Sequence, residues 1–350
     1  MRRHSFFEVK AIQAEHGDAL LVTYGVTQLR LRHILVDGGP AGTLPKLLSV
    51  LEGCKRHGRV CLEALVVTHY DLDHIKGIIE LLQARPEWLD IKNIWFNGYH
   101  HIAPFDILGA ADGDTLGDLI ELGKYPWNRQ FGGGPIVVGN ELPLKMPGGL
   151  KVWILSPDQH SLSRLAAEWG EGKVIPESSD SVVAEDLLGR KDKWPPLEFA
   201  DLASTPCRRD SSVPNGSSIA LLLEFHGHRM LLAGDSFTEV VSDAIEEYWN
   251  DTPPVIHLLK VSHHGSTANT NSNLLQTIQC KRFLISTNGK IHGHPDHALI
   301  ARLVASTTQS ELIFNYDCEC TTNWRNPPAD WPRFSTRFPH PAESFVRVAF

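Results

Sequence analysis

The segment VVTHYDLDHIKG, residues 66–77, decides the fold of this 350-residue chain. It continues an apolar, β-branched run over 62–67 that predicts a buried strand, and a helix is predicted from residue 75 to residue 84. Between them lie four side chains of metal-binding type: His69, Asp71, Asp73 and His74. A polar loop between a buried strand and a helix is where α/β folds place their functional sites. Taken alone, the loop is also compatible with a turn in which Asp73 caps the helix.

Two later strands end in the same kinds of residue. A hairpin predicted over 218–233 runs into Asp235, and a strand predicted over 255–261 runs into the pair His263 and His264. An ordinary turn would explain the first end, and a helix entry with hydrogen-bonded imidazoles would explain the second. Because the carboxyl ends of neighbouring strands lie at one edge of a sheet, the ordered set favours a single shared site.

The spacing within the first loop suits two metal ions. Alternate residues His69 and Asp71 face one way, whereas Asp73 and His74 turn toward a second position. Carboxylate oxygens mixed with imidazole nitrogens suit Mn²⁺ or Zn²⁺, and the share of carboxylates favours Mn²⁺. Two such ions make water acidic enough to supply hydroxide near neutral pH, and they contact phosphate oxygens. In-line hydrolysis of a phosphodiester is therefore the reaction that this pair of ions would serve.

Composition limits the function classes. The net charge of −8 excludes a generally basic protein that coats nucleic acid. The few cations near the predicted site, Lys260, Lys290 and Arg208-Arg209, are interpreted as solvated surface residues. No apolar run reaches the ~18 residues of a membrane span, and the first residues lack a signal-peptide core. We therefore expect a cytoplasmic protein without a membrane partner.

The positions of the histidines indicate a functional site, whereas those of the cysteines do not. Six of the 18 histidines lie between residues 257 and 297, and clustered histidines indicate a metal or acid–base site. The six cysteines show no disulfide framework. Cys318 and Cys320 lack the second pair that a zinc knuckle needs, so no function is assigned to them here.

The order of predicted elements divides the chain into four parts. Residues 1–96 alternate strands and helices, which is typical of one half of a layered α/β core. Over 97–214 glycine- and proline-rich pieces interrupt this pattern, apart from one predicted strand at 150–155. We interpret this part as core strands with a lineage-specific insertion. Residues 215–315 resume the alternation as the second half, and 316–350 form a Trp- and Pro-rich extension.

Taken in order, these segments resemble the metallo-β-lactamase fold superfamily, whose hallmark is His-x-His-x-Asp-His followed by a later Asp and a later His. More narrowly, they are similar to the hydrolase domain of ComEC-type competence proteins. The segments that carry the resemblance besides 66–77 are HGDALLV (16–22), ILVDGG (34–39), NGSSIALLLEFHGHRMLLAGD (215–235), HLLKVSHHGS (257–266) and HGHP (292–295). The resemblance implies an αββα sandwich: two facing mixed sheets with helices on their outer faces, here with a large central insertion.

The resemblance also implies roles for individual residues. His69 and Asp71 match the ligands of a first metal, Asp73 and His74 those of a second, Asp235 the bridging carboxylate and His263 the last metal histidine. Asp37 matches a supporting residue beneath the site. Asp71 replaces the second histidine of the hallmark, as is usual in the competence-type branch. The histidine that commonly precedes the central hairpin is absent, and Asn215 stands in its place, so Asn215 or water would complete the first site.

These residues predict a hydrolase that uses two divalent metal ions, most simply a DNA or RNA nuclease in a defence or DNA-processing system. Asp73 would be needed for turnover because it holds the second ion. Either His264 or His294 would protonate the leaving oxygen or hold a phosphate, and the sequence does not choose between them. The alternatives are a phosphocholine esterase, thioesterase or lactonase, and a regulatory subunit that binds a protein partner through 97–214.

Overall fold

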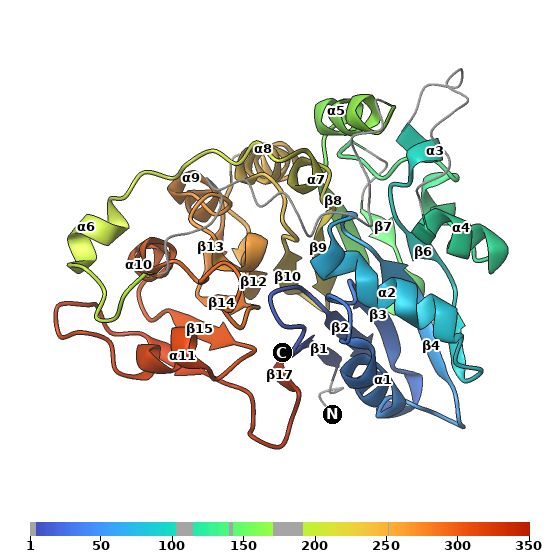
Figure 1. Cartoon of the computed structure of the whole chain (residues 1–350), viewed down its shortest axis with the longest axis horizontal. Helices are drawn as coiled ribbons and strands as arrows, with labels where there is room; N and C mark the ends of the chain where they lie inside the picture. Colours follow the sequence, from blue (N-terminus) through green and yellow to red (C-terminus); the bar gives the residue numbers. More distant parts are fainter. Residues whose placement is uncertain (1–4, 103–114, 140–142, 171–191, 251) are drawn as a thin grey trace.

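The computed structural model describes residues 5–102, 115–139, 143–170, 192–250 and 252–350. Two large sheets face each other, and helices cover the outer face of each (Figure 1). The predicted αββα sandwich is confirmed. Parts of the predicted insertion, 103–114, 140–142 and 171–191, lie outside the described residues.

The first sheet has the strand order β17-β1-β2-β3-β4-β5, and β6 also pairs with β4. Its strands are β1 (Phe6–Ile12), β2 (Leu20–Gly25), β3 (Arg32–Val36), β4 (Val60–Val66), β5 (Leu89–Ile91), β6 (Ile94–Trp95) and β17 (Phe345–Ala349). Strands β3 and β4 are parallel. Their carboxyl ends therefore place Asp37 beside the loop that begins at Thr68.

The second sheet has the order β16-β15-β14-β12-β10-β9-β8-β7. Its strands are β7 (Leu144–Lys145), β8 (Lys151–Ser156), β9 (Ala220–Phe225), β10 (His228–Leu232), β12 (Leu258–Lys260), β14 (Arg282–Ile285), β15 (Glu311–Phe314) and β16 (Ser335–Arg337). Strands β10, β12 and β14 are parallel neighbours. Because their carboxyl ends share one edge, Asp235 and the two histidines at 263 and 264 lie together, as the sequence predicts.

The strand predicted over 255–261 is two strands in the structure. β11 (Val255–Ile256) pairs with β13 (Gln279–Cys280) in a separate small sheet, whereas β12 joins the large one. His257 separates them: its backbone N–H donates to the Arg229 carbonyl at 2.8 Å, and its Nδ1 accepts from the Arg229 N–H at 3.1 Å. A side chain that competes for backbone partners interrupts the ladder at that residue.

Helices cover the two outer faces. Against the first sheet pack α1 (Leu44–Glu52), α2 (Leu72–Ala84), α4 (Thr115–Leu122) and α5 (Gln159–Gly170). Against the second pack α6 (Phe199–Ala203), α8 (Thr238–Trp249), α9 (Ser272–Gln276) and α10 (His297–Ser306). The short helices are α3 (Tyr99–Ile102), α7 (Val213–Gly216), α11 (Glu319–Thr322) and the 3₁₀ turns Gln28–Arg30, Arg129–Phe131, Pro147–Gly149, His263–Gly265 and Asn323–Arg325. No described helix is long and apolar enough to cross a lipid bilayer.

The layer between the sheets is apolar. Val22, Ile34 and Ala64 of the first sheet share one buried cluster with Leu223 and Met230 of the second. Each of these side chains has no exposed surface. Each core strand turns one face to this layer and the other face to helices. Its residues are therefore apolar at almost every position, and for this reason the core strands are recognisable in the sequence.

The C-terminal segment contributes an edge strand to each sheet. β17 pairs antiparallel with β1, and β16 pairs parallel with β15. In the region 97–214, β7 and β8 extend the second sheet beyond β9. Strand β8 coincides closely with the strand predicted at 150–155.

Candidate metal centre

The loop after β4 is anchored from below by Asp37. Its two carboxylate oxygens accept hydrogen bonds from the Thr68 N–H and the Thr68 hydroxyl, both at 2.8 Å. Asp37 Oδ2 also lies 2.9 Å from His74 Nδ1. A carboxylate can only accept, so His74 carries its proton on Nδ1, and the Nε2 lone pair points to the other side of the ring. Asp37 thus holds the loop and orients the ring of His74.

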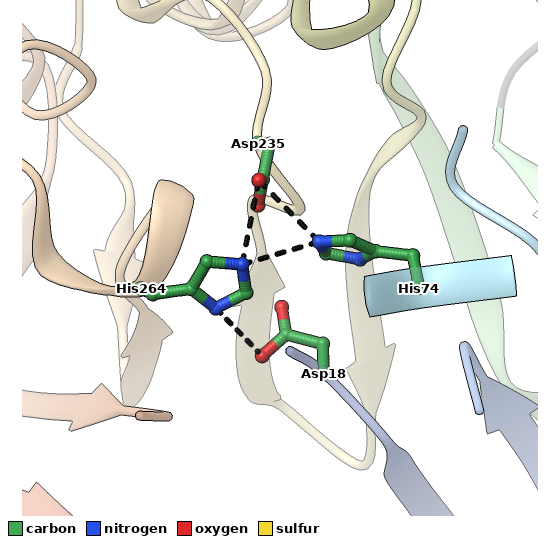
Figure 2. Close-up of side chains that lie close together, drawn as sticks. All are labelled: Asp18, His74, Asp235 and His264. Carbon is green, nitrogen blue, oxygen red and sulfur yellow. Dashed lines mark hydrogen bonds and ion pairs between the residues drawn. The ribbon is translucent and has the colours of Figure 1, made fainter. Parts of the chain in front are cut away.

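Four buried side chains meet at the edge between the sheets, as Figure 2 shows: Asp18, His74, Asp235 and His264. His74 Nε2 lies 3.2 Å from His264 Nε2 and 3.3 Å from Asp235 Oδ2. His264 Nε2 also lies 3.5 Å from Asp235 Oδ2. One ligand atom from each of the four residues lies within 4.8 Å of all the others. These atoms come from a turn before β2, the first turn of α2, and the ends of β10 and β12.

Asp73 closes the same cluster from the α2 side. Its Oδ2 lies 3.2 Å from His264 Nε2 and 3.7 Å from His74 Nε2. Burial would raise the pKa of this carboxyl, but the charge of His74 and the hydrogen bond from His264 outweigh burial and lower it. The carboxylate is therefore ionised and faces two imidazole nitrogens.

The arrangement of lone pairs fits a divalent metal ion. His264 Nδ1 lies 3.1 Å from the carbonyl oxygen of Ser286, so this nitrogen carries the proton, as Nδ1 of His74 does. Two Nε2 lone pairs then face each other, with ionised Asp73 and Asp235 beside them. Lone pairs and carboxylates at this separation repel unless a cation lies among them. A hydrogen bond that Nδ1 donates to a carboxylate or carbonyl oxygen is also the usual way in which a metal-binding histidine is oriented.

Without a metal, protons supply the missing charge. Burial lowers the pKa of His264, but Asp235 and Asp18 together raise it to about 9. Burial also lowers the pKa of His74, but Asp235, Asp73 and Asp37 outweigh it and raise this pKa well above its ordinary value. Conversely, His264 and His74 lower the pKa of Asp235 against the effect of burial. The cluster is therefore built to attract positive charge.

His69 and Asp71 lie next to this cluster. The rings of His69 and His74 have centroids 4.3 Å apart, and His69 Nε2 is 3.5 Å from Asp71 Oδ2. Among the described residues, His69 Nε2 and Asp235 Oδ1 are buried without a hydrogen-bond partner. Buried polar atoms of native proteins rarely lack partners, so these two are candidate ligand atoms.

His263 lies at the side of the cluster. Its Nε2 is 3.9 Å from Asp235 Oδ2, while its Nδ1 is 2.8 Å from Asn269 Oδ1. The amide of Asn215 donates to Asp210 Oδ2 at 2.7 Å and lies 3.5 Å from His263 Nδ1. The side-chain nitrogen of Asn215 thus faces Asp210 and His263.

The backbone of the two adjacent histidines is strained. His263 and His264 have φ of 47° and 54°, the left-handed region that non-glycine residues rarely adopt. Such conformations persist where the surrounding structure enforces them, often at functional sites. Here they bring His264 into the cluster and leave His263 beside it.

His294 forms a second dyad near His263. Its Nδ1 donates to Asp296 Oδ1 at 2.9 Å, and Asp296 Oδ2 accepts from the N–H and hydroxyl of Thr267 at 2.8 and 2.7 Å. Burial opposes ionisation of Asp296, yet His294 and Thr267 lower its pKa to about 2. The ring centroids of His294 and His263 are 6.0 Å apart. The structure thus places His294 at the side of the site next to His263.

No family model matches the chain. ComE operon protein 3 of Bacillus subtilis is 30% identical over 198 residues, which are 57% of this chain and 22% of that protein. The chain thus spans about a fifth of the length of that relative.

Solved structures that resemble the chain at low identity include a metallo-β-lactamase fold protein, YhfI, and a zinc-bound protein, PqqB. YhfI of Bacillus subtilis is 12% identical with a TM-score of 0.42, covering 99% of this chain and 100% of YhfI. Zinc-bound PqqB of Methylobacterium extorquens is 11% identical with a TM-score of 0.38, covering 95% and 86%. Two facing sheets, outer helices and an Asp–His cluster at the strand ends are all present here. These features make up the αββα architecture of this chain.

Within this αββα fold, sequence reasoning missed Asp18 and misplaced Lys260. Lys260 is fully buried and forms an ion pair with Asp18, which corrects its interpretation as a surface cation. Asp18 Oδ1 lies 3.7 Å from His264 Nδ1. A lysine within the apolar run of HLLKV was the available signal, since a lysine inside a buried strand needs a buried carboxylate.

The buried ion pair between Lys260 and Asp18 leads to a prediction about stability. Lys260→Met should lower the free energy of unfolding by about 3–5 kcal/mol, because it leaves the Asp18 carboxylate buried without its cation. Urea titration measures the loss. The double variant Asp18→Asn/Lys260→Met should recover part of it. Lys92→Met, which removes a surface partner of Asp90, is the control and should cost no more than ~1 kcal/mol. A loss for Lys260→Met as small as for the control would contradict the prediction.

Proposed function

We propose that this chain is a metal-dependent hydrolase of phosphodiesters, and most simply a nuclease. The observation that carries the proposal is the pair of facing Nε2 atoms of His74 and His264, 3.2 Å apart and flanked by Asp73 and Asp235. This donor set suits Zn²⁺ or Mn²⁺. When bound, divalent ions supply Lewis acidity toward phosphate oxygens and hydroxide near neutral pH.

Two groups of residues would hold the ions. Asp73, His74, Asp235 and His264 would bind one, and His69, Asp71 and Asp235 would bind the other. This assignment exchanges the roles that sequence reasoning gave to the two adjacent histidines. His264 Nε2 is within 3.5 Å of Asp73 and Asp235, whereas His263 Nε2 comes no closer to Asp235 than 3.9 Å.

His263 and His294 are then free to act on the substrate. Asn269 holds the Nδ1 side of His263, and Asp296 holds the Nδ1 side of His294. A fixed Nδ1 leaves Nε2 of each ring as the atom that donates to a phosphate oxygen or to the leaving oxygen. Positioned proton transfer of this kind contributes roughly 10²- to 10⁴-fold in rate. We assign these two rings to phosphate binding and leaving-group protonation.

The charge of the chain favours recognition through the metal ions. With a net charge of −8, it has no general attraction for a polyanion. Affinity for nucleic acid would therefore depend on a few phosphates at the ions, and its dependence on salt would be weak. The same site could act on a phosphocholine ester, a thioester or a lactone, and these remain the competing substrates.

One panel of assays separates these possibilities. The purified chain, loaded with Mn²⁺, Mg²⁺ or Zn²⁺, is offered single- and double-stranded DNA, RNA, a chromogenic bis-phosphodiester, a phosphocholine ester, a thioester and a lactone. We expect metal-dependent cleavage of the bis-phosphodiester and of at least one nucleic acid. The variant Asp235→Ala, purified in parallel, reports contaminating nuclease. Turnover of only the other esters would overturn the substrate class, and no turnover by metal-loaded protein would favour a partner-binding subunit.

A further inference from the structure

Two cysteines lie together outside the metal centre. The Sγ atoms of Cys318 and Cys320 are 3.2 Å apart, and both side chains are only partly buried. Cα atoms two residues apart are separated by at most about 7 Å, and the turn into α11 shortens that span. Disulfides bridge Cα atoms at about 4.4–6.8 Å with a bond of about 2.05 Å. A small movement of the two sulfurs is therefore enough to join them.

We propose that Cys318 and Cys320 are a reversible dithiol–disulfide site that exchanges with small-molecule disulfides such as oxidised glutathione. The thiolate of Cys318 attacks one sulfur of oxidised glutathione, and one glutathione leaves as its thiolate. Cys320 then loses its proton and attacks the Cys318 sulfur of the mixed disulfide, releasing the second glutathione. Two protein thiols are oxidised, one glutathione disulfide is reduced to two thiols, and the protons pass to the released glutathione thiolates.

The two sulfurs differ in a way that suits this order of attack. The sulfurs of Cys318 and Cys320 share one hydrogen bond, and the Thr321 hydroxyl oxygen lies 3.5 Å from the Cys318 sulfur. The hydrogen bond with Cys320 is the largest effect on Cys318 and, against burial, lowers the pKa of its thiol to about 6. The same hydrogen bond, together with burial, raises the pKa of Cys320. Cys318 is thus the attacking thiolate, and Cys320 keeps the proton until the second step.

The pair also supports a loop of the metal centre. Cys318 Sγ lies 3.5 Å from the carbonyl oxygen of Asn288. At Gly289, whose φ is +66°, an added Cβ would lie 2.5 Å from Cys320 Sγ, so only glycine allows this close approach. The same loop runs on to His294. Formation of the disulfide would therefore change the contacts that the two sulfurs make with the backbone of Asn288 and Gly289.

Redox titration of the full chain tests the site. The protein is equilibrated in glutathione buffers of increasing oxidised fraction, quenched with acid, alkylated, and mapped by mass spectrometry. We expect the peptide with both cysteines to lose two alkylation sites together and two hydrogen masses, reversibly. We also expect Cys318 to alkylate at pH 7 at least about tenfold faster than Cys207, whose pKa is raised by burial.

Three variants sharpen the outcome. Cys320→Ser should stop at the glutathione adduct on Cys318, Cys318→Ser should abolish the fast reaction, and Cys207→Ser should behave as the wild type. The proposal fails if the wild type accumulates the Cys318 adduct without the internal disulfide. It also fails if the pair reacts no faster than Cys207. Neither readout depends on hydrolysis, so the result is independent of the proposed function.

Discussion

Asp235→Ala is expected to bind at least one metal ion fewer per chain than the wild type and to show only background hydrolysis, while remaining folded. Asp235 Oδ2 lies within 3.5 Å of Nε2 of both His74 and His264, and it is the carboxylate that both proposed ions would share. The fold should survive because the backbone N–H of Asp235 is held independently by the Ser218 hydroxyl at 3.0 Å.

Elemental analysis after dialysis, with circular dichroism on the same samples, measures this effect. Asp90→Ala is the matched control, because Asp90 is a half-exposed carboxylate that pairs with the surface residue Lys92 and should leave the metal content unchanged. Unchanged stoichiometry in folded Asp235→Ala would contradict the shared-carboxylate assignment. Loss of metal from the control as well would point to a general loss of structure.

The second large effect separates the two adjacent histidines. His264→Ala should lose metal and fall to background activity, because its Nε2 faces Asp73, His74 and Asp235. His263→Ala should keep its metal and lose roughly 10²- to 10⁴-fold in rate, as expected for a group that transfers a proton or holds a phosphate. The loss should be smaller on nitrophenyl substrates, whose leaving group needs no proton.

Metal content and rate are measured for both variants at saturating metal, so that weak binding is not mistaken for lost chemistry. Loss of metal from His263→Ala, together with retention by His264→Ala, would restore the assignment made from the sequence. His294→Ala provides a further comparison: it should resemble His263→Ala, since the ring of His294 lies beside His263 and is oriented by Asp296.

The fold was predictable because its evidence is local. Strand β4 is apolar apart from Glu63, which pairs with Arg32, because both faces of its sheet are covered, and the polar loop follows directly at Thr68. The small strands were harder to recognise. β11 and β12 form one apolar run in the sequence, and only the contacts between His257 and Arg229 divide it.

The sequence by itself determined the alternation of strands and helices and the four-ligand loop from His69 to His74, because a six-residue loop keeps its ligands together in any fold that forms its strand and helix. The αββα sandwich was implied by the resemblance to a known superfamily. The tertiary structure alone decided which of two neighbouring histidines enters the cluster, through left-handed backbone at both His263 and His264. It alone paired Asp18, in the turn before β2 of the first sheet, with Lys260 of β12 in the second sheet. Two charged residues that are distant in the sequence form a buried ion pair only when the sheets pack. Packing removes water from both charges, and an unpaired charge is costly only once it has lost that water.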